Sequence, residues 1–475
     1  MPDTMKTSSG LVHEDRLFPS DAVQRDIARR LYREVRDLPI ISPHGHTDPR
    51  WFAYNEPFGN PAELLLAPDH YIYRMLYSQG ISLDAVGVPS KAGQPATDPR
   101  EAWRTFAQNY HLFRGTPSRM WLDHVFDTVF GMTVPLSAET ADDYYDVIDA
   151  ALQSGAYRPR ALFDRFNIEL LATTECPTDS LKHHETIQSS GWNGRVISAY
   201  RPDAVVDADH ERFQTALDEF ADITGENTRS WKGYLCAHAK RREDFKAIGT
   251  TSSDHGHPTA FTADLSAADA EALFDKVVAG KGTAQDHELF RGQMLTEMAR
   301  MSLDDGLVLQ IHPGSCRNHN GPLFHSHGRD KGADIPMQTD YVHALRPLLN
   351  AFGNDPHLSI IVFTLDETSY SRELAPLAGH YPALKLGPAW WFHDSPEGMR
   401  RFREQTTETA GFYNTVGFND DTRAFLSIPA RHDVARRVDC SFLARLVSEH
   451  RMHEDEAHEL ARALAYDLAK AAYKL

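Results

Sequence analysis

Three pairs of histidines have the H-x-H spacing of a metal site, and they are His44/His46, His255/His257 and His325/His327. Because the chain has 25 histidines, roughly one such pair is expected by chance, so spacing alone carries little weight. His44 and His46 differ in context, since they follow the apolar run 38–41, which is typical of a buried strand. Side chains at i and i+2 of a strand point the same way, so both imidazoles can face one ion.

The other two pairs stand in polar surroundings. His255 and His257 follow the polar stretch 250–254, and His325 and His327 follow a segment rich in turn residues. Both contexts favour loops over strands. We therefore interpret these four side chains as solvated or hydrogen-bonded loop histidines.

Short apolar runs alternate with amphipathic segments along most of the chain. The expected strands are 39–44, 168–173, 195–200, a weak one at 247–253, 307–312, 358–364, 384–389 and 415–419. Helical patterns at 265–278, 337–351 and 396–410 lie between them. This alternation predicts parallel β/α units, and a count near eight favours a closed (β/α)8 TIM-type barrel over an open sheet.

Two further segments are predicted to be helical. Residues from about 50 to 165 show aromatic side chains at helical spacing and no convincing strand, and about 435–475 also has a helical pattern. No repeat or clear linker divides the chain. We therefore expect one domain over residues 1–475, with a helical insertion after the first strand and a helical C-terminal extension.

In a β/α barrel the chemistry lies at the carboxyl ends of the strands. His44 and His46 end the first expected strand, His312 ends the fifth, and Asp421 follows the eighth. Three imidazoles and a carboxylate suit Zn²⁺, and manganese or iron would be tolerated. The fourth strand end offers no lysine that could be carbamylated, and the sixth offers no histidine, which favours one metal ion with open positions.

Charged side chains accompany these candidate ligands. Asp421 and Arg423 are at i and i+2, so the carboxylate is expected to stay ionised and ready to accept a proton. Arg423 could stabilise negative charge on a substrate oxygen, or form a salt bridge with Asp420. Arg201 follows an apolar strand and could clamp a carboxylate, or cap a helix.

Composition excludes several function classes. Apolar residues make up 41% and charged residues 24% of the chain, and the net charge is −18, which argues against nucleic acid or an anionic membrane as a partner. There is no long apolar run or secretory leader, and the four cysteines are scattered, so we expect a cytoplasmic protein. Residues 279–283 do not complete a phosphate-binding loop, and no nucleotide cofactor is expected.

Taken together, these motifs resemble the uronate isomerase (glucuronate isomerase) family of the amidohydrolase superfamily, nearly end to end. The H-x-H pair marks only the superfamily. The more specific segments are Asp69-His70-Tyr71, Trp390-Trp391 and the D-x-R-x-F segment from Asp421 to Phe425. One departure is Glu175-Cys176, where two carboxylates are expected, and it puts any role of that turn in doubt.

Enzymes of this family interconvert D-glucuronate and D-fructuronate, or D-galacturonate and D-tagaturonate, through a cis-enediol intermediate. The resemblance implies one divalent metal ion held by His44, His46, His312 and Asp421. Asp421 would also move the proton between C2 and C1, with Tyr71 and Arg423 assisting at the oxygens. The implied substrate-binding residues are Arg201, Trp390, His70, Arg317 and His255.

Two other functions compete with the isomerase. One is a mononuclear metal-dependent hydrolase of the same superfamily, a deaminase or lactonase, in which the metal activates water. The missing histidine at the sixth strand end weighs against it. The other is an inactive sugar-acid-binding protein, which the full acid/base set disfavours. The expected partner is a small anionic sugar acid, and the protein is expected to be a homo-oligomer.

Overall fold

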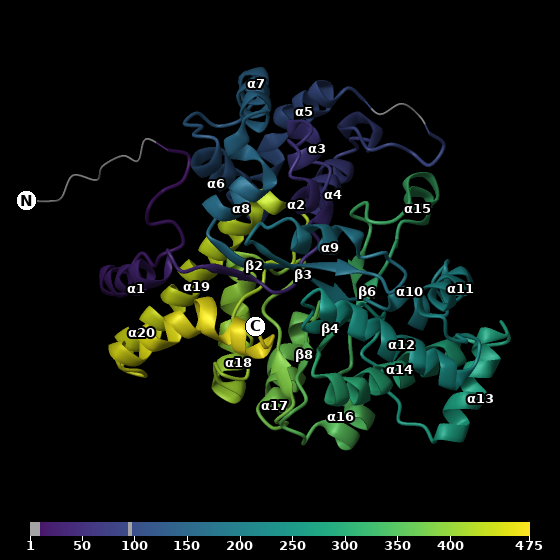
Figure 1. The fold of residues 1–475 in the computed structure, drawn as a ribbon. Helices are drawn as coiled ribbons and strands as arrows, with labels where there is room; N and C mark the ends of the chain where they lie inside the picture. The colour runs from purple at the N-terminus through teal and green to yellow at the C-terminus, as the bar shows by residue number, and fades with distance from the viewer. Residues whose placement is uncertain (1–9, 94–96) are drawn as a thin grey trace, which may run out of the picture.

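The computed structural model describes residues 10–93 and 97–475. The first nine residues, in which no secretory leader was expected, lie outside the described residues. Seven parallel strands form one sheet in sequence order, and Figure 1 shows β2, β3, β4 and β8 among the surrounding helices. They are β1 (Ile40–Ser42), β2 (Ile168–Glu175), β3 (Arg195–Tyr200), β4 (Ser252–His255), β5 (Val308–Ile311), β8 (Ile360–Val362) and β9 (Leu384–Leu386).

The expected eighth strand is reduced to isolated backbone contacts between β9 and β1. Thr415 forms one parallel bridge with Leu386 of β9, and His46 N donates to Thr422 O at 3.0 Å. Gly417 (φ +74°) and Asp421 (φ +36°) leave the extended conformation, so the ladder cannot continue. The barrel arrangement is confirmed, whereas a regular strand over 415–419 was wrong.

The weak fourth strand also differs from the expectation. Helix α12 (Trp231–Ala247) occupies the start of the expected segment, and β4 begins only at Ser252. Its four residues are all polar, and the side chains of Ser252 and Asp254 contact polar groups on and after β5. Ser252 Oγ accepts a hydrogen bond from Gln310 Nε2 of β5 at 3.1 Å. A search for apolar runs therefore misplaces this strand.

Helices fill the chain between β1 and β2. They are α2 (Pro49–Tyr54), α3 (Pro61–Leu65), α4 (His70–Ser78), α5 (Pro99–Gln108), α6 (Pro117–His124), α7 (Ala141–Leu152) and α8 (Pro159–Arg165). Several begin with proline at the first turn, where no backbone donor is needed. Aromatic side chains such as Trp103, Phe106 and Phe126 are fully buried among these helices. The cluster also includes Ile40 and Leu171, so it packs on the barrel.

Outer helices surround the remaining strands (Figure 1). They are α9 (Lys182–Ser189), α10 (Asp203–Val206), α11 (Phe213–Thr224), α12, α13 (Ala267–Val278), α14 (Ala284–Asp305), α16 (Arg346–Phe352), α17 (Ala375–Ala378) and α18 (Pro396–Ala410). The helix expected at 337–351 begins only at Arg346. The preceding chain forms β7 (Ile335–Pro336), which pairs antiparallel with β6 (Ser315–Cys316). His325 and His327 lie in α15 (Gly321–His327), so their assignment to a loop was wrong.

The last part of the chain is helical and returns to the barrel. It comprises α19 (Ile428–Ser448), α20 (Glu454–Arg462) and α21 (Leu468–Ala472), and α1 (Ala22–Val35) packs along α19. Tyr473 is fully buried, donates to Gln310 Oε1 at 2.8 Å and accepts from Asn419 Nδ2 at 3.1 Å. Within residues 10–93 and 97–475, no helix combines the length and apolar character needed to cross a bilayer.

Candidate active site

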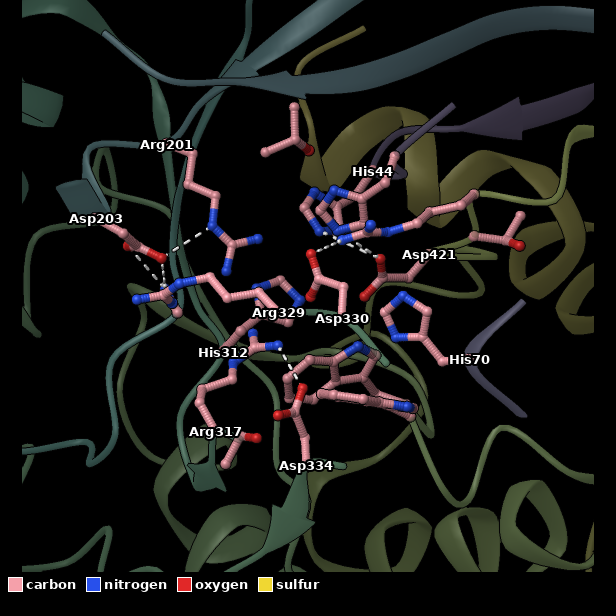
Figure 2. A pocket seen from close by; sticks show the side chains of 18 of the residues that line it. His44, His70, Arg201, Asp203, His312, Arg317, Arg329, Asp330, Asp334 and Asp421 are labelled. Carbon is pink, nitrogen blue, oxygen red and sulfur yellow. Dashed lines mark hydrogen bonds and ion pairs between the residues drawn. The ribbon is translucent and has the colours of Figure 1, made fainter. Parts of the chain in front are cut away.

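A pocket of about 740 Å³ opens at the carboxyl ends of the strands (Figure 2). Of the site residues predicted from the sequence, ten line it: His44, His46, His70, Tyr71, Arg201, His312, Arg317, Trp390, Asp421 and Arg423. The eleventh, His255, does not. Segments far apart in sequence thus converge on one cavity, as the barrel requires.

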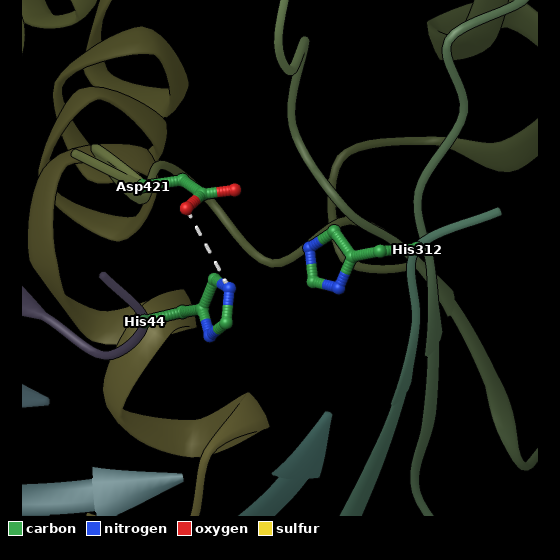
Figure 3. A group of neighbouring side chains, drawn as sticks. All are labelled: His44, His312 and Asp421. Carbon is green, nitrogen blue, oxygen red and sulfur yellow. Dashed lines mark ion pairs between the residues drawn. The ribbon is translucent and has the colours of Figure 1, made fainter. Parts of the chain in front are cut away.

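The candidate metal ligands gather on one side of this pocket. His44, His312 and Asp421 each offer a ligand atom, and these atoms lie within 4.8 Å of one another (Figure 3). Asp421 Oδ1 is 3.6 Å from His44 Nε2 and 3.2 Å from His46 Nε2. The four predicted ligands are therefore brought together, with His46 the most exposed of them.

The backbone between His44 and His46 must approach its neighbours closely. A Cβ on Gly45 would lie 3.4 Å from both Ala172 O and Thr422 O, at the near limit of an ordinary contact. The absence of a side chain lets the chain after β1 sit between β2 and the segment that carries Asp421. Asp421 itself adopts a left-handed φ of +36°, a conformation that costs energy for a residue other than glycine.

The electrostatics of the cluster suit a cation. Burial lowers the pKa of His44 to about 4, so its imidazole is neutral and can act as a ligand. Burial would raise the pKa of Asp421, but His44 and His46 hold it well below its usual value. Nε2 of His312 is buried without a hydrogen-bond partner among the described residues. The neutral imidazole of His44, the unpaired Nε2 of His312 and an ionised carboxylate fit a divalent metal ion.

A buried carboxylate fixes the orientation of His312. Asp254 Oδ1 lies 2.6 Å from His312 Nδ1, and the imidazole stacks on Phe363 with ring centroids 3.8 Å apart. A carboxylate that holds the second ring nitrogen is the usual support of a metal-ligating histidine. Nε2 is thereby left as the free nitrogen of His312.

Arg201 is held between two carboxylates. Its Nε donates to Asp203 Oδ2 at 2.9 Å, and its Nη1 lies 3.1 Å from Asp254 Oδ2. Burial would lower the pKa of Arg201, but Asp254 and Asp203 raise it above its ordinary value. Helix α10 has no side-chain cap, so the alternative that Arg201 caps this helix was wrong.

Strand register decides between Asp254 and His255. No role was expected for Asp254, whereas the family resemblance implied that His255 contacts the substrate. On β4, Ser252 and Asp254 face β5 side chains inside the barrel, so His255 points to the opposite face. His255 and His257 are only 1% and 3% exposed, so neither is solvated. His255 ends β4, where its Nε2 lies 3.2 Å from Ser253 Oγ, whereas His257 lies in the loop that follows, as predicted.

Helix α4 delivers His70 and Tyr71 to the pocket. Asp69 caps this helix by accepting from Tyr71 N at 2.8 Å. The Tyr71 hydroxyl donates to Asp394 Oδ1 at 2.6 Å and accepts from Phe392 N at 2.8 Å. Burial, followed by the charge of Asp394, raises the pKa of Tyr71 well above its usual value. Its hydroxyl is thus neutral and directed at Asp394.

Arginines form a cationic rim around the pocket (Figure 2). Arg423 Nη2 lies 3.2 Å from Asp330 Oδ2, and Arg317 Nη1 lies 3.2 Å from Asp334 Oδ2. The alternative partner of Arg423, Asp420, is instead 3.0 Å from His432 Nε2. Both rim arginines remain partly exposed, so they can meet an anionic ligand at the mouth.

The sequence profile of the glucuronate isomerase family matches residues 17–473. The chain belongs to this family. It is 72% identical over 464 residues to the uronate isomerase of Phenylobacterium zucineum (strain HLK1), covering 98% of this chain and 97% of that protein. The expectation of an isomerase, and not of a hydrolase or an inactive binding protein, is confirmed.

Solved structures of glucuronate and uronate isomerases have the same fold. The glucuronate isomerase of Caulobacter crescentus superposes with a TM-score of 0.97 at 70% identity, over 98% of this chain and 97% of that one. The uronate isomerase of Thermotoga maritima gives 0.90 at 28% identity, over 97% and 99%. The predicted α/β barrel of the glucuronate isomerase family is therefore confirmed.

Proposed function

We propose that this glucuronate isomerase family member interconverts D-glucuronate and D-fructuronate, or D-galacturonate and D-tagaturonate. The observation that carries the proposal is a single pocket holding the ionised carboxylate of Asp421 and the buried guanidinium of Arg201. An aldose–ketose isomerase of a sugar acid needs these two groups, a base for C2–H and a cation for the sugar-acid carboxylate.

Asp421 takes the proton from C2 and returns it to C1. Its carboxylate is ionised at neutral pH, since the charge that His44 gains in acid and the hydrogen bond from His46 keep the pKa of Asp421 below its usual value despite burial, and one carboxylate can serve both carbons of a cis-enediol intermediate. Arg423 lies two residues away and stabilises negative charge on the substrate oxygens. Tyr71 lines the same pocket and assists at the substrate oxygens, and His70 lines it as a substrate-binding residue.

Arg201 holds the substrate carboxylate. Asp203 and Asp254 fix its guanidinium in place before substrate arrives, so little conformational freedom is lost on binding. Trp390 and Arg317 line the same pocket and complete the substrate-binding set. His255 is not included, because it lies outside the pocket lining.

His44, His46, His312 and Asp421 would hold one divalent metal ion, for which zinc is expected and manganese or iron would be accepted. The donor set supports this, since Nε2 of His312 is buried without a partner among the described residues. When bound, the ion supplies a Lewis acid that polarises substrate oxygens.

Incubation of metal-replete protein with D-glucuronate and with D-galacturonate in D₂O, followed by NMR, tests the proposal. We expect the matching ketose to appear, with deuterium introduced at C1 or C2 to the extent that the Asp421 proton exchanges with solvent. Absence of a ketose from both sugar acids would contradict the proposed activity. Ketose formation with only one of them assigns the substrate.

A further inference from the structure

A second group of metal-binding side chains lies across the Arg201 guanidinium from the candidate ligands described above. It consists of Asp203, His255 and His257, which each offer one ligand atom, and these atoms lie within 4.8 Å of one another. Asp203 stands beside Arg201 on one wall of the pocket (Figure 2). The two histidines come from the end of β4 and the residues that follow it.

The histidine nitrogens of this group lack partners. His255 and His257 are 1% and 3% exposed. Nδ1 of His255 and both ring nitrogens of His257 are buried without a hydrogen-bond partner among residues 10–93 and 97–475. Buried polar atoms are nearly always paired, because an unpaired one keeps its full desolvation penalty. A group bound between the two rings would give a partner to one of these nitrogens on each histidine.

The protonation states and supporting contacts fit a cation better than an anion. Burial lowers the pKa of both histidines, so their rings are neutral. His255 Nε2 lies 3.2 Å from Ser253 Oγ, which leaves Nδ1 as the ligand atom and reproduces the usual second contact of a metal-bound histidine. Two neutral imidazoles and a carboxylate form a ligand set typical of zinc.

Asp203 retains capacity for a further ligand. Its oxygens accept from Arg201 Nε at 2.9 Å and from Gly256 N at 3.1 and 3.3 Å. Two carboxylate oxygens provide about four acceptor sites, so these bonds do not exhaust them. Burial would raise the pKa of Asp203, but Arg201 and His257 lower it, and the group is therefore anionic.

Local charge and access also favour a cation. The carboxylates of Asp203, Asp207 and Glu288 act on His257 to favour a positive charge, whereas the guanidinium of Arg291 opposes it. Arg291 is itself paired with Asp207 and with Glu288. Asp203 and Asp207 line the main pocket, so an ion can reach the group from the pocket.

We propose that Asp203, His255 and His257 form a second divalent-cation site, suited to Zn²⁺ and separate from the ligand set of His44, His46, His312 and Asp421. The chain would then hold two ions at different places, one more than the sequence indicates. An ion on Asp203 fixes the carboxylate that holds Arg201 Nε, and so stiffens the anion-binding side of the pocket. The proposal does not depend on the substrate or on turnover.

Metal counting tests this site. The full chain is stripped with a chelator, reloaded with Zn²⁺, passed through a desalting column and analysed for zinc per chain by mass spectrometry. We expect two ions in the unmodified protein, one in His257→Gln, one in His44→Gln and none in the double variant. His343→Gln is the matched control, because His343 is exposed, and it should retain two ions.

A single ion in the unmodified protein, unchanged by His257→Gln, would overturn the proposal. Two ions that persist in both His257→Gln and His255→Gln would also overturn it, since the second ion would then lie elsewhere. Circular dichroism checks the fold of each variant, and His255→Gln serves if His257→Gln does not fold. Cobalt loading adds a second readout, because each occupied site contributes its own visible absorption. If the protein binds two ions but produces no ketose, the proposed function is refuted and the second metal site is not.

Discussion

Asp254 Oδ1 lies 2.6 Å from His312 Nδ1, and Asp254 Oδ2 lies 3.1 Å from Arg201 Nη1. One buried carboxylate therefore orients a candidate metal ligand and a candidate substrate-binding group together. Burial would raise the pKa of Asp254, but Arg201 and His312 hold it well below its usual value. The two halves of the site are thus linked through Asp254.

Asp254→Asn should weaken metal binding by about 10- to 100-fold, the usual loss when a supporting carboxylate of a metal ligand is removed. The amide cannot supply a full negative charge to His312 Nδ1 or to Arg201. The measurement is chelator competition for Zn²⁺, compared with His343→Gln as a control. Unchanged zinc affinity would show that Asp254 does not support the ligand.

Asp421→Asn should lower kcat by at least about 10²- to 10⁴-fold, because a positioned general base contributes that much. Since Asp421 is also a proposed ligand, zinc content must be measured on the same sample. A metal-loaded variant that keeps substantial ketose production would contradict the assignment of the base.

Arg201→Met should raise KM by about 10- to 100-fold, since charge-assisted hydrogen bonds are worth a few kcal/mol and a carboxylate clamp acts in the ground and transition states alike. Steady-state kinetics with the preferred sugar acid provide the measurement. Arg317→Met at the rim is the matched comparison, and its effect on KM should be smaller because Arg317 is one-third exposed. A change confined to kcat would argue against the clamp.

Glu175 should make the protein less stable as the pH rises. Burial raises its pKa from 4.5 to about 7, so the folded state keeps a proton that the unfolded state releases. The unfolding free energy therefore falls from pH 4.5 to 7 and levels off above, by up to about 3 kcal/mol at 1.36 kcal/mol per pKa unit.

Glu175→Gln removes this titration, so the fall in unfolding free energy between pH 5 and pH 8 should be smaller in the variant than in the unmodified protein. Urea unfolding at the two pH values gives the difference, and Glu408→Gln is the control because Glu408 is exposed. An equal pH dependence in the Glu175 variant and the unmodified protein would refute the prediction.

Tyr473→Phe should destabilise the barrel by about 1–3 kcal/mol, the cost of leaving a buried acceptor unpaired. The hydroxyl that is lost donates a hydrogen bond to Gln310 on β5 and accepts one from Asn419, two residues before Asp421 in the chain. Thermal unfolding measures the change, and Tyr413→Phe is the control, since Tyr413 is 61% exposed. A melting temperature equal to that of the control would contradict the prediction.

Local patterns predicted the elements whose stability is local. The apolar run at 195–200 and the amphipathic pattern at 396–410 coincide with β3 and α18, because burial of one face or of both faces leaves a periodic trace. The polar β4 left only a weak trace, which placed the strand too early, and the pattern at 415–419 predicted a strand that the structure reduces to a single bridge. Their conformations depend on partners in β5, β9 and β1.

The sequence by itself determined that histidines, a carboxylate and arginines stand at strand ends, and the motifs around them identified the family. Only the tertiary structure decided which neighbouring side chain enters the pocket. Asp254 and His255 are adjacent in the chain, but the pairing of β4 with β5 turns the first inward and the second outward. Side chains alternate along a strand, so a one-residue choice of register reverses every role, and that choice is made by packing between distant segments.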